Sequence, residues 1–195
     1  MNWKLPSMLF AILAAPWFLP TAPLVAQEGK EDGAAAAARA AMPGPVHKQL
    51  ARLVGDYTTV TKFYVQPGAT PSESDGTAKI TSVLDGRFLM EENTGNMFGQ
   101  PLKGLRYYGY NNGSKQYEGI WTYTRSTGIM TLTGKSSDDG KTINWTATFD
   151  DPRGKQTLYV VSHQLDDDHL VVELIAKNPD GKNGPTIETT YTRKK

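Results

Sequence analysis

The amino-acid sequence predicts an all-β fold: a single antiparallel up-and-down β-barrel of about ten strands with one short N-terminal helix. From about Tyr57 to the C-terminus, short runs alternate between apolar and polar residues, which is the period of a strand with one dry face. Short turns separate the runs, and short connections favour antiparallel pairing of neighbours. Closing so long a sheet removes its exposed edges. A two-layer Greek-key sandwich is the alternative.

The first 26 residues have the pattern of a secretory signal peptide. Residues 1–4 carry one positive charge, residues 5–19 are mostly apolar, and Ala26 supplies a small residue before the expected cleavage. A retained membrane anchor is the alternative, but prolines interrupt the apolar run, and a spanning helix needs about 20 apolar residues. We therefore expect an exported protein, periplasmic or extracellular, with no stable membrane span after the signal is removed.

Residues 27–44 are expected to form a tether ahead of the domain, which we assign to residues 45–195. The tether combines charged residues and an alanine run at 34–38, and it closes with Pro43-Gly44 ahead of Pro45. The alanines favour a helical turn or two, but so short a helix is marginal in isolation. The segment is therefore predicted to be mostly disordered.

A short amphipathic helix is predicted over residues 46–54. Val46, Leu50 and Leu53 share one stripe at helical spacing, Pro45 suits the first turn, and Gly55 suits the C-terminal cap. A single short helix ahead of such a sheet commonly closes one end of a barrel.

The strands follow the helix, and residues 142–149 show their pattern best. Ile143, Trp145, Ala147 and Phe149 alternate there with polar side chains, as in a strand with one apolar face. The predicted strands lie near residues 57–65, 76–84, 87–95, 103–111, 115–124, 128–136, 141–149, 155–165, 169–177 and 186–193.

The segments between strands have the chemistry of tight turns. Asp85-Gly86, Asn112-Gly113, Asp139-Gly140 and Asp180-Gly181 each place a glycine where the backbone of a hairpin needs a positive φ.

Composition excludes several classes of function. The chain contains no cysteine, so disulfides and thiolate metal sites are excluded. It has 21 lysines and arginines against 20 aspartates and glutamates, which leaves no basic excess. We therefore expect no nucleic-acid partner.

Several stretches occur in the order found in one bacterial family. They include residues 50–56 (LARLVGD), 86–92 (GRFLMEE), 109–112 (GYNN), 117–121 (YEGIW) and 190–193 (TYTR). Through them the chain from about Gly44 to Lys195 resembles the family called domain of unknown function 1579. Two positions differ from the family pattern: Tyr57 stands where tryptophan is expected, and Asn111 where aspartate is common.

The resemblance implies a fold similar to lipocalins and fatty-acid-binding proteins, the calycin-like barrels. It imports little about function, because the family has no settled activity. In calycin-like barrels an aromatic residue after the opening helix closes the barrel floor, and by analogy Tyr57 takes that role here.

The predicted ligand site is the barrel interior, where methionine and aromatic side chains make an adaptable apolar lining. An eight-stranded barrel is just wide enough to be filled by side chains or to hold one small ligand, and ten strands enclose more. A fully packed interior is the alternative. The candidate ligand-binding residues are Met90, Glu92, Arg106, Trp121, Met130, Trp145 and Phe149, with Val160 as a further wall residue.

Two adjacent glutamates lie in an otherwise apolar strand, and alternation directs one of them inward. A buried carboxylate needs a partner, and Arg87 or Arg106 can supply it. Glu92 and Arg106 are our candidates for orienting a ligand. A structural role, as a satisfied polar pair or a glutamate at a strand edge, is favoured over a functional one, which would be to fix a ligand head group or to act as an acid or base.

The sequence offers one candidate cofactor ligand and no recognised catalytic motif. His163 lies within a predicted strand and is the alternative candidate for an axial haem ligand, whereas no two histidines have metal-ligand spacing. The chain has no G-x-S-x-G, P-loop or H-E-x-x-H motif. We therefore expect no cofactor and no metal.

The function that these observations favour is non-catalytic binding of a small apolar or amphipathic ligand inside the barrel. Such a protein needs an internal void of a few hundred Å³ with a mouth. An envelope interaction or structural protein with a filled barrel is the main alternative. An enzyme that uses an inward carboxylate is the third.

Overall fold

The computed structural model describes residues 25–137, 140–177 and 181–195, with side chains described from Gly33 onward. The predicted signal peptide, residues 1–26, lies almost wholly outside the described residues. The chain divides into two units, residues 1–37 and 38–195. Neither helix in the described ranges has the length and hydropathy that a membrane crossing requires.

Helix α1 spans Val25–Ala40, in the segment where the sequence predicts a mostly disordered tether. The alanine run at 34–38 explains the difference in conformation, because alanine has the highest helix propensity of any residue. The boundary between tether and domain stays a prediction.

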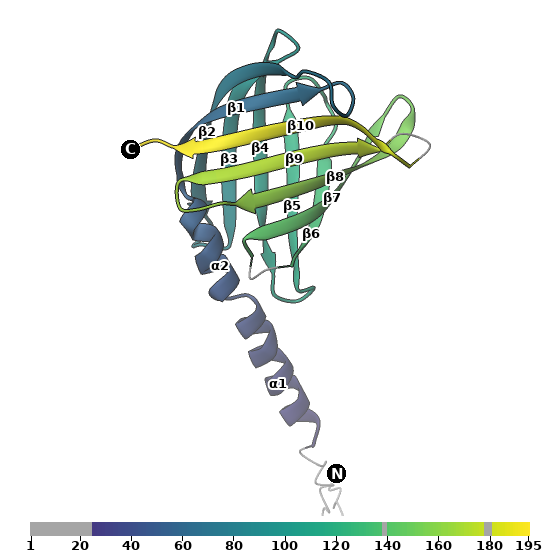
Figure 1. The fold of residues 1–195 in the computed structure, drawn as a ribbon. Coiled ribbons are helices and arrows are strands. Elements are labelled where there is room, and N and C mark those ends of the chain that lie inside the picture. The colour runs from purple at the N-terminus through teal and green to yellow at the C-terminus, as the bar shows by residue number, and fades with distance from the viewer. Residues whose placement is uncertain (1–24, 138–139, 178–180) are drawn as a thin grey trace, which may run out of the picture. The chain divides into compact units, whose positions relative to one another are not determined.

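Ten antiparallel strands close into one barrel, which confirms the predicted fold class. Each strand pairs with its neighbours along the chain, and β1 pairs with β10 to complete the circle (Figure 1). The two-layer sandwich is therefore wrong. The strands are β1 (Gly55–Tyr64), β2 (Ser72–Val83), β3 (Phe88–Met97), β4 (Gln100–Asn111), β5 (Gln116–Tyr123), β6 (Met130–Ser136), β7 (Thr142–Asp151), β8 (Gly154–Gln164), β9 (His169–Lys177) and β10 (Asn183–Arg193).

The helix ahead of the barrel is α2 (Pro45–Leu50), continued by a 3₁₀ turn at Ala51–Leu53. This confirms the predicted short helix. Leu50 is buried in the core, and the hydroxyl of Tyr57 donates a hydrogen bond to the carbonyl oxygen of Leu53 at 2.8 Å. Tyr57 is 1% exposed, so the turn and this aromatic ring together close one end of the barrel.

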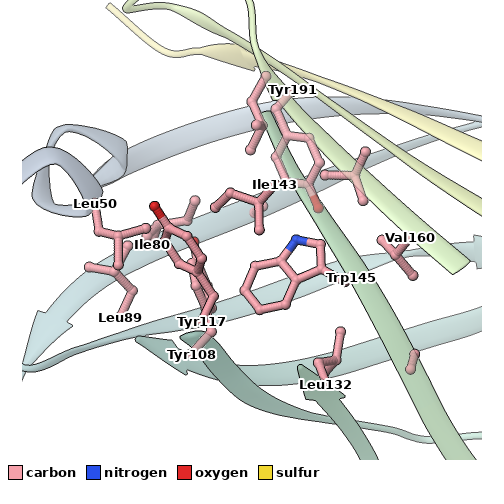
Figure 2. Packing of buried hydrophobic residues seen from close by; sticks show 14 of the residues in the cluster. Leu50, Ile80, Leu89, Tyr108, Tyr117, Leu132, Ile143, Trp145, Val160 and Tyr191 are labelled. Atoms are coloured by element: carbon pink, nitrogen blue, oxygen red, sulfur yellow. The ribbon is translucent and has the colours of Figure 1, made fainter. Parts of the chain in front are cut away.

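Aromatic side chains fill the half of the barrel nearest α2. Tyr108, Tyr117 and Trp145 meet edge to face, with ring centroids 5.8–6.3 Å apart for the two pairs that include Trp145 (Figure 2). The indole Nε1 of Trp145 donates to Ser162 Oγ at 2.9 Å, so its polar atom is satisfied inside the core. This end of the barrel is therefore packed.

Candidate ligand cavity

A cavity of about 110 Å³ lies inside the barrel, at the ends of the strands away from α2. Phe63 lies near the end of β1, Met97 at the end of β3 and Met130 at the start of β6, and all three line it. Leu174 of β9 and Ile187 of β10 complete its apolar wall. The cavity is smaller than the predicted few hundred Å³, because the aromatic rings described above occupy the other half of the interior.

The size of the cavity limits what it can enclose. An engineered apolar cavity of about 150 Å³ in another protein binds benzene, so a volume near 110 Å³ suits a group of similar or smaller size. A longer molecule fits only if its tail extends through the mouth.

A buried ion pair lies beside the cavity. Glu91 and Arg106 are direct cross-strand partners on β3 and β4, with Nη1 of Arg106 3.4 Å from Oε2 of Glu91. The side chain of Glu91 is 1% exposed and that of Arg106 is 19% exposed. Tyr191 Oη donates to Oε1 of Glu91 at 2.9 Å, and Asn93 Nδ2 donates to the same oxygen at 3.4 Å.

The electrostatics of this cluster follow from burial and from the charge of Glu91. Burial is the largest single influence on the pKa of Arg106 and lowers it, but the combined attraction of Glu91, Tyr191 and Tyr108 outweighs burial, so the pKa of Arg106 lies above its ordinary value. Burial and the nearby Glu91 charge hold the pKa of Tyr191 well above its ordinary value. The cluster therefore holds a charged arginine and a neutral tyrosine at neutral pH.

Three polar atoms of the cavity wall are buried and lack a hydrogen-bond partner within the described part of the chain. They are Asn93 Oδ1, Arg106 Nε and Trp121 Nε1. A buried polar atom left unpaired costs about 1–3 kcal/mol, so each is a strong point of attachment for a ligand.

Gly104 creates the space in which two of these atoms meet. It is the cross-strand partner of Asn93, and a Cβ at Gly104 would collide with Asn93 Oδ1 and lie 2.8 Å from Trp121 Nε1. Both atoms therefore face the area above the Gly104 backbone. Arg106 lies two residues further along β4, on the same face of the strand as Gly104. Its cross-strand partner on the neighbouring strand β5 is Trp121.

An aromatic pair stands beside the cavity at its outer end. Phe98 is 69% exposed, and its ring centroid lies 5.2 Å from that of Phe63, which lines the cavity. Phe98 occupies the two-residue turn between β3 and β4 with a φ of +52°, a conformation that a bulky residue rarely adopts.

The structure brings three of the predicted ligand-binding residues together and separates the others. Arg106, Trp121 and Met130 line the cavity. Trp145 belongs to the buried core, and Phe149 packs against that core.

Met90 and Glu92 were assigned to the wrong face of their strand. Leu89 and Glu91 are buried, so the side chains that alternate with them point outward, and Glu92 is exposed. The ion-pair partner of Arg106 is therefore Glu91. The sequence correctly predicted that one of the two glutamates points inward and has an arginine partner, but it did not identify which glutamate.

The geometry does not fit His163 as a haem ligand inside the barrel. Its side chain is exposed, and its Nδ1 lies 2.9 Å from Thr142 Oγ1 on the neighbouring strand. Because β8 alternates, the inward positions beside it are Ser162 and Val160.

Sequence reasoning missed Asn93 and Tyr191 as parts of the site. The alternation that directs Glu91 inward also directs Asn93 inward, so that signal was present. Tyr191 lies 100 residues from Glu91 in the chain, and only closure of the barrel brings the two side chains together.

Comparison with known proteins places the chain in a family. No curated protein sequence matches it. The crystal structure of Rv2717c from M. tuberculosis matches with a TM-score of 0.58 and 17% identity, covering 79% of this chain and 100% of that chain. The S-type phycobiliprotein lyase CPES from Guillardia theta matches with a TM-score of 0.51 and 15% identity, covering 82% of this chain and 97% of that one. At these identities the likeness shows a shared fold alone. A family model described as "Protein of unknown function (DUF1579)" matches residues 42–193, so the chain belongs to that family.

Proposed function

We propose that this protein is an exported, non-catalytic binding protein that holds a small apolar or amphipathic molecule in the barrel cavity. The observation that carries the proposal is a cavity with apolar walls and, at one side, polar atoms that find no hydrogen-bond partner among the residues described here. Ligand sites combine apolar lining with a few convergent polar groups in this way. The shared fold with a protein named as a phycobiliprotein lyase is compatible with a ligand role and specifies no ligand for this chain.

The energetics favour a weak to moderate binder. A ligand that buries roughly 200 Å² of apolar surface gains about 5 kcal/mol before the entropic cost of association. Each hydrogen bond to one of the unpartnered wall atoms adds about 1 kcal/mol. Selectivity therefore depends on the polar atoms, whereas the apolar wall supplies most of the affinity.

The contacts of Glu91 favour binding over catalysis. Arg106, Tyr191 and Asn93 all direct donor groups at its carboxylate, so the group is held as a hydrogen-bond acceptor. A general acid or base must exchange a proton with a substrate, and donors already occupy both of its oxygens.

Two measurements test the proposal. Native mass spectrometry of protein purified from the periplasm of expressing cells is expected to show a bound small molecule. Toluene, chosen to match the cavity, is then titrated and followed by chemical-shift changes in NMR spectra.

A matched pair of variants locates the binding site. Thr189 lines the cavity and Thr190 is its outward neighbour on β10. Thr189→Phe is expected to lower toluene affinity at least tenfold by filling the space, and Thr190→Phe to leave it within twofold. Equal effects of the two substitutions, or an absence of toluene binding, would contradict the proposal.

A further inference from the structure

We propose that the cavity selects a ligand whose polar end is neutral and carries both a hydrogen-bond acceptor and a donor, as a carboxamide does. This inference rests on the proposed binding function and adds the chemical class of the ligand. Counting partners within the described residues only, the polar wall contains two unpartnered donors, Arg106 Nε and Trp121 Nε1, and one unpartnered acceptor, Asn93 Oδ1. A carbonyl oxygen satisfies the donors, and an N–H satisfies the acceptor.

The charge of the site argues against an ionic ligand. Among the described residues that line the cavity, Arg106 is the one that carries a charge. Its charge is already matched by Glu91 at 3.4 Å. An anionic ligand would lose its hydration and meet a pair with no net charge, with a carboxylate close by. A cationic ligand would meet the guanidinium at the wall, which repels it.

The neighbouring carboxylate of Glu91 fixes the orientation of the Asn93 side-chain amide, and so it determines which amide atom faces the cavity. Its Nδ2 donates to Glu91 Oε1 at 3.4 Å. The reverse orientation would turn the amide oxygen toward a carboxylate oxygen and lose that bond. Oδ1 is therefore the atom that faces the space above Gly104, beside Trp121 Nε1.

Three six-carbon ligands that differ in their polar end test the selectivity. Hexanamide, hexanoate and hexylammonium are titrated separately into the protein at pH 7, where the second is an anion and the third a cation. We expect hexanamide to bind at least tenfold more tightly than either ion, which corresponds to about 1.4 kcal/mol.

The indole N–H of Trp121 reports the contact directly in NMR spectra. Its resonance is expected to shift on hexanamide binding, because its Nε1 gains an acceptor. The indole N–H of Trp145 is bonded to Ser162 and serves as the internal reference, which is expected to move little. Trp121→Phe removes the donor and assigns the resonance. It is expected to lower the affinity ratio of hexanamide to toluene at least fivefold.

Two glutamate variants test the charge argument. Glu91→Gln leaves Arg106 without its counter-ion, so the preference for hexanamide over hexanoate is expected to fall at least tenfold. Glu92→Gln removes the same charge from the outer face of the same strand and is expected to leave that preference unchanged. If Glu91→Gln does not fold, the ligand series and Trp121→Phe still decide the question in folded protein.

The outcomes separate this inference from the proposed function. If toluene binds and hexanoate or hexylammonium binds as tightly as hexanamide, the neutral-ligand inference is overturned and the binding function stands. If a shift appears at Trp145 rather than at Trp121, the inference is also overturned. If toluene does not bind, the proposed function fails, and this inference fails with it because it rests on that function.

Discussion

At the scale of single residues, the Glu91 carboxylate organises the polar side of the cavity. It accepts hydrogen bonds from Tyr191 and Asn93 and pairs with Arg106, so side chains from three strands depend on one buried charge. Such a cluster is costly to break, because removal of one member leaves another charge buried without a partner. The cluster therefore fixes the positions of the atoms offered to a ligand.

The buried tyrosines predict a loss of stability at alkaline pH. Burial and the nearby Glu91 charge raise the pKa of Tyr108 and of Tyr191 above their ordinary values. Above about pH 10 the unfolded chain loses these protons while the folded protein keeps them, so the free energy of unfolding falls as the pH rises. Below that pH their contribution is fully present.

Urea unfolding at a series of pH values from 9 to 11 measures this slope. Tyr191→Phe is expected to make it shallower, because one raised pKa is removed. Tyr159→Phe, at an exposed position, is the control and is expected to retain the wild-type slope. A slope that Tyr191→Phe leaves unchanged would show that this hydroxyl does not contribute.

The two glutamates of β3 show what the sequence reveals about a site. The sequence indicates that one of them points inward, because adjacent residues of a strand point to opposite faces of the sheet. Its role emerges only from the register, in which Glu91 and not Glu92 lies opposite Arg106. A shift of one residue exchanges the two faces of a strand, so an error of one position moves a candidate from the cavity to solvent.

At the scale of elements, alternation predicted the strands well and their ends less well. Strand β7 was predicted at residues 141–149 and spans Thr142–Asp151. Strand β2 begins at Ser72, four residues before its predicted start at residue 76. Its first residues are polar on both faces at the rim of the barrel, so they give no apolar signal.

The backbone of the β3–β4 turn is strained, and this turn lies at the end of the barrel that holds the cavity. Phe98 and Gly99 both have positive φ, +52° and +75°, as a two-residue hairpin of type I′ requires. Asparagine is the usual residue at the first position, and a bulky residue there costs about 1–3 kcal/mol. The contact with Phe63 offsets part of that cost, since an aromatic pair contributes about 0.5–1.5 kcal/mol.

Phe98→Asn is expected to change the free energy of unfolding by less than about 1 kcal/mol, because relief of strain and loss of the ring contact oppose each other. Toluene is expected to dissociate several times faster, since the ring beside the cavity is gone. Exchange rates from NMR line shapes measure the dissociation.

Leu84→Asn is the matched control for the turn substitution. Leu84 has a φ of +51° and is 65% exposed in the turn at the other end of the barrel. Its replacement is expected to raise the free energy of unfolding by about 1 kcal/mol and to leave toluene exchange unchanged. Faster exchange in this variant as well would show that turn strain, and not the Phe98 ring, controls access.

At the scale of the whole molecule, the barrel is divided along its axis into a packed half and a hollow half. Leu50 of α2 lies with Ile80 and Leu89 at the packed end (Figure 2). Alternation identifies the inward residues of both halves equally, so the sequence predicted an interior but not where it is empty. That depends on how the rings of Tyr108 and Trp145 fit together across strands far apart in the chain.

This division predicts that stability and binding respond to different ends of the barrel. Leu50→Ala removes a side chain that is only 6% exposed at the packed end. It is expected to lower the free energy of unfolding by about 3 kcal/mol and to leave toluene affinity within twofold of the wild type. Leu174→Ala enlarges a cavity that already exists. Because the Leu174 side chain is only half-buried, the substitution is expected to lower the free energy of unfolding by about 1–2 kcal/mol.

The same Leu174→Ala variant is expected to admit a larger ligand, so naphthalene should bind at least fivefold more tightly than to the wild type. Urea unfolding measures the free energies, and NMR titration measures the affinities. If Leu50→Ala changes toluene affinity as much as Leu174→Ala changes naphthalene affinity, the two ends act as one cooperative core. The packed half would then serve as part of the binding site, and ligand affinity would track the free energy of unfolding across all the variants.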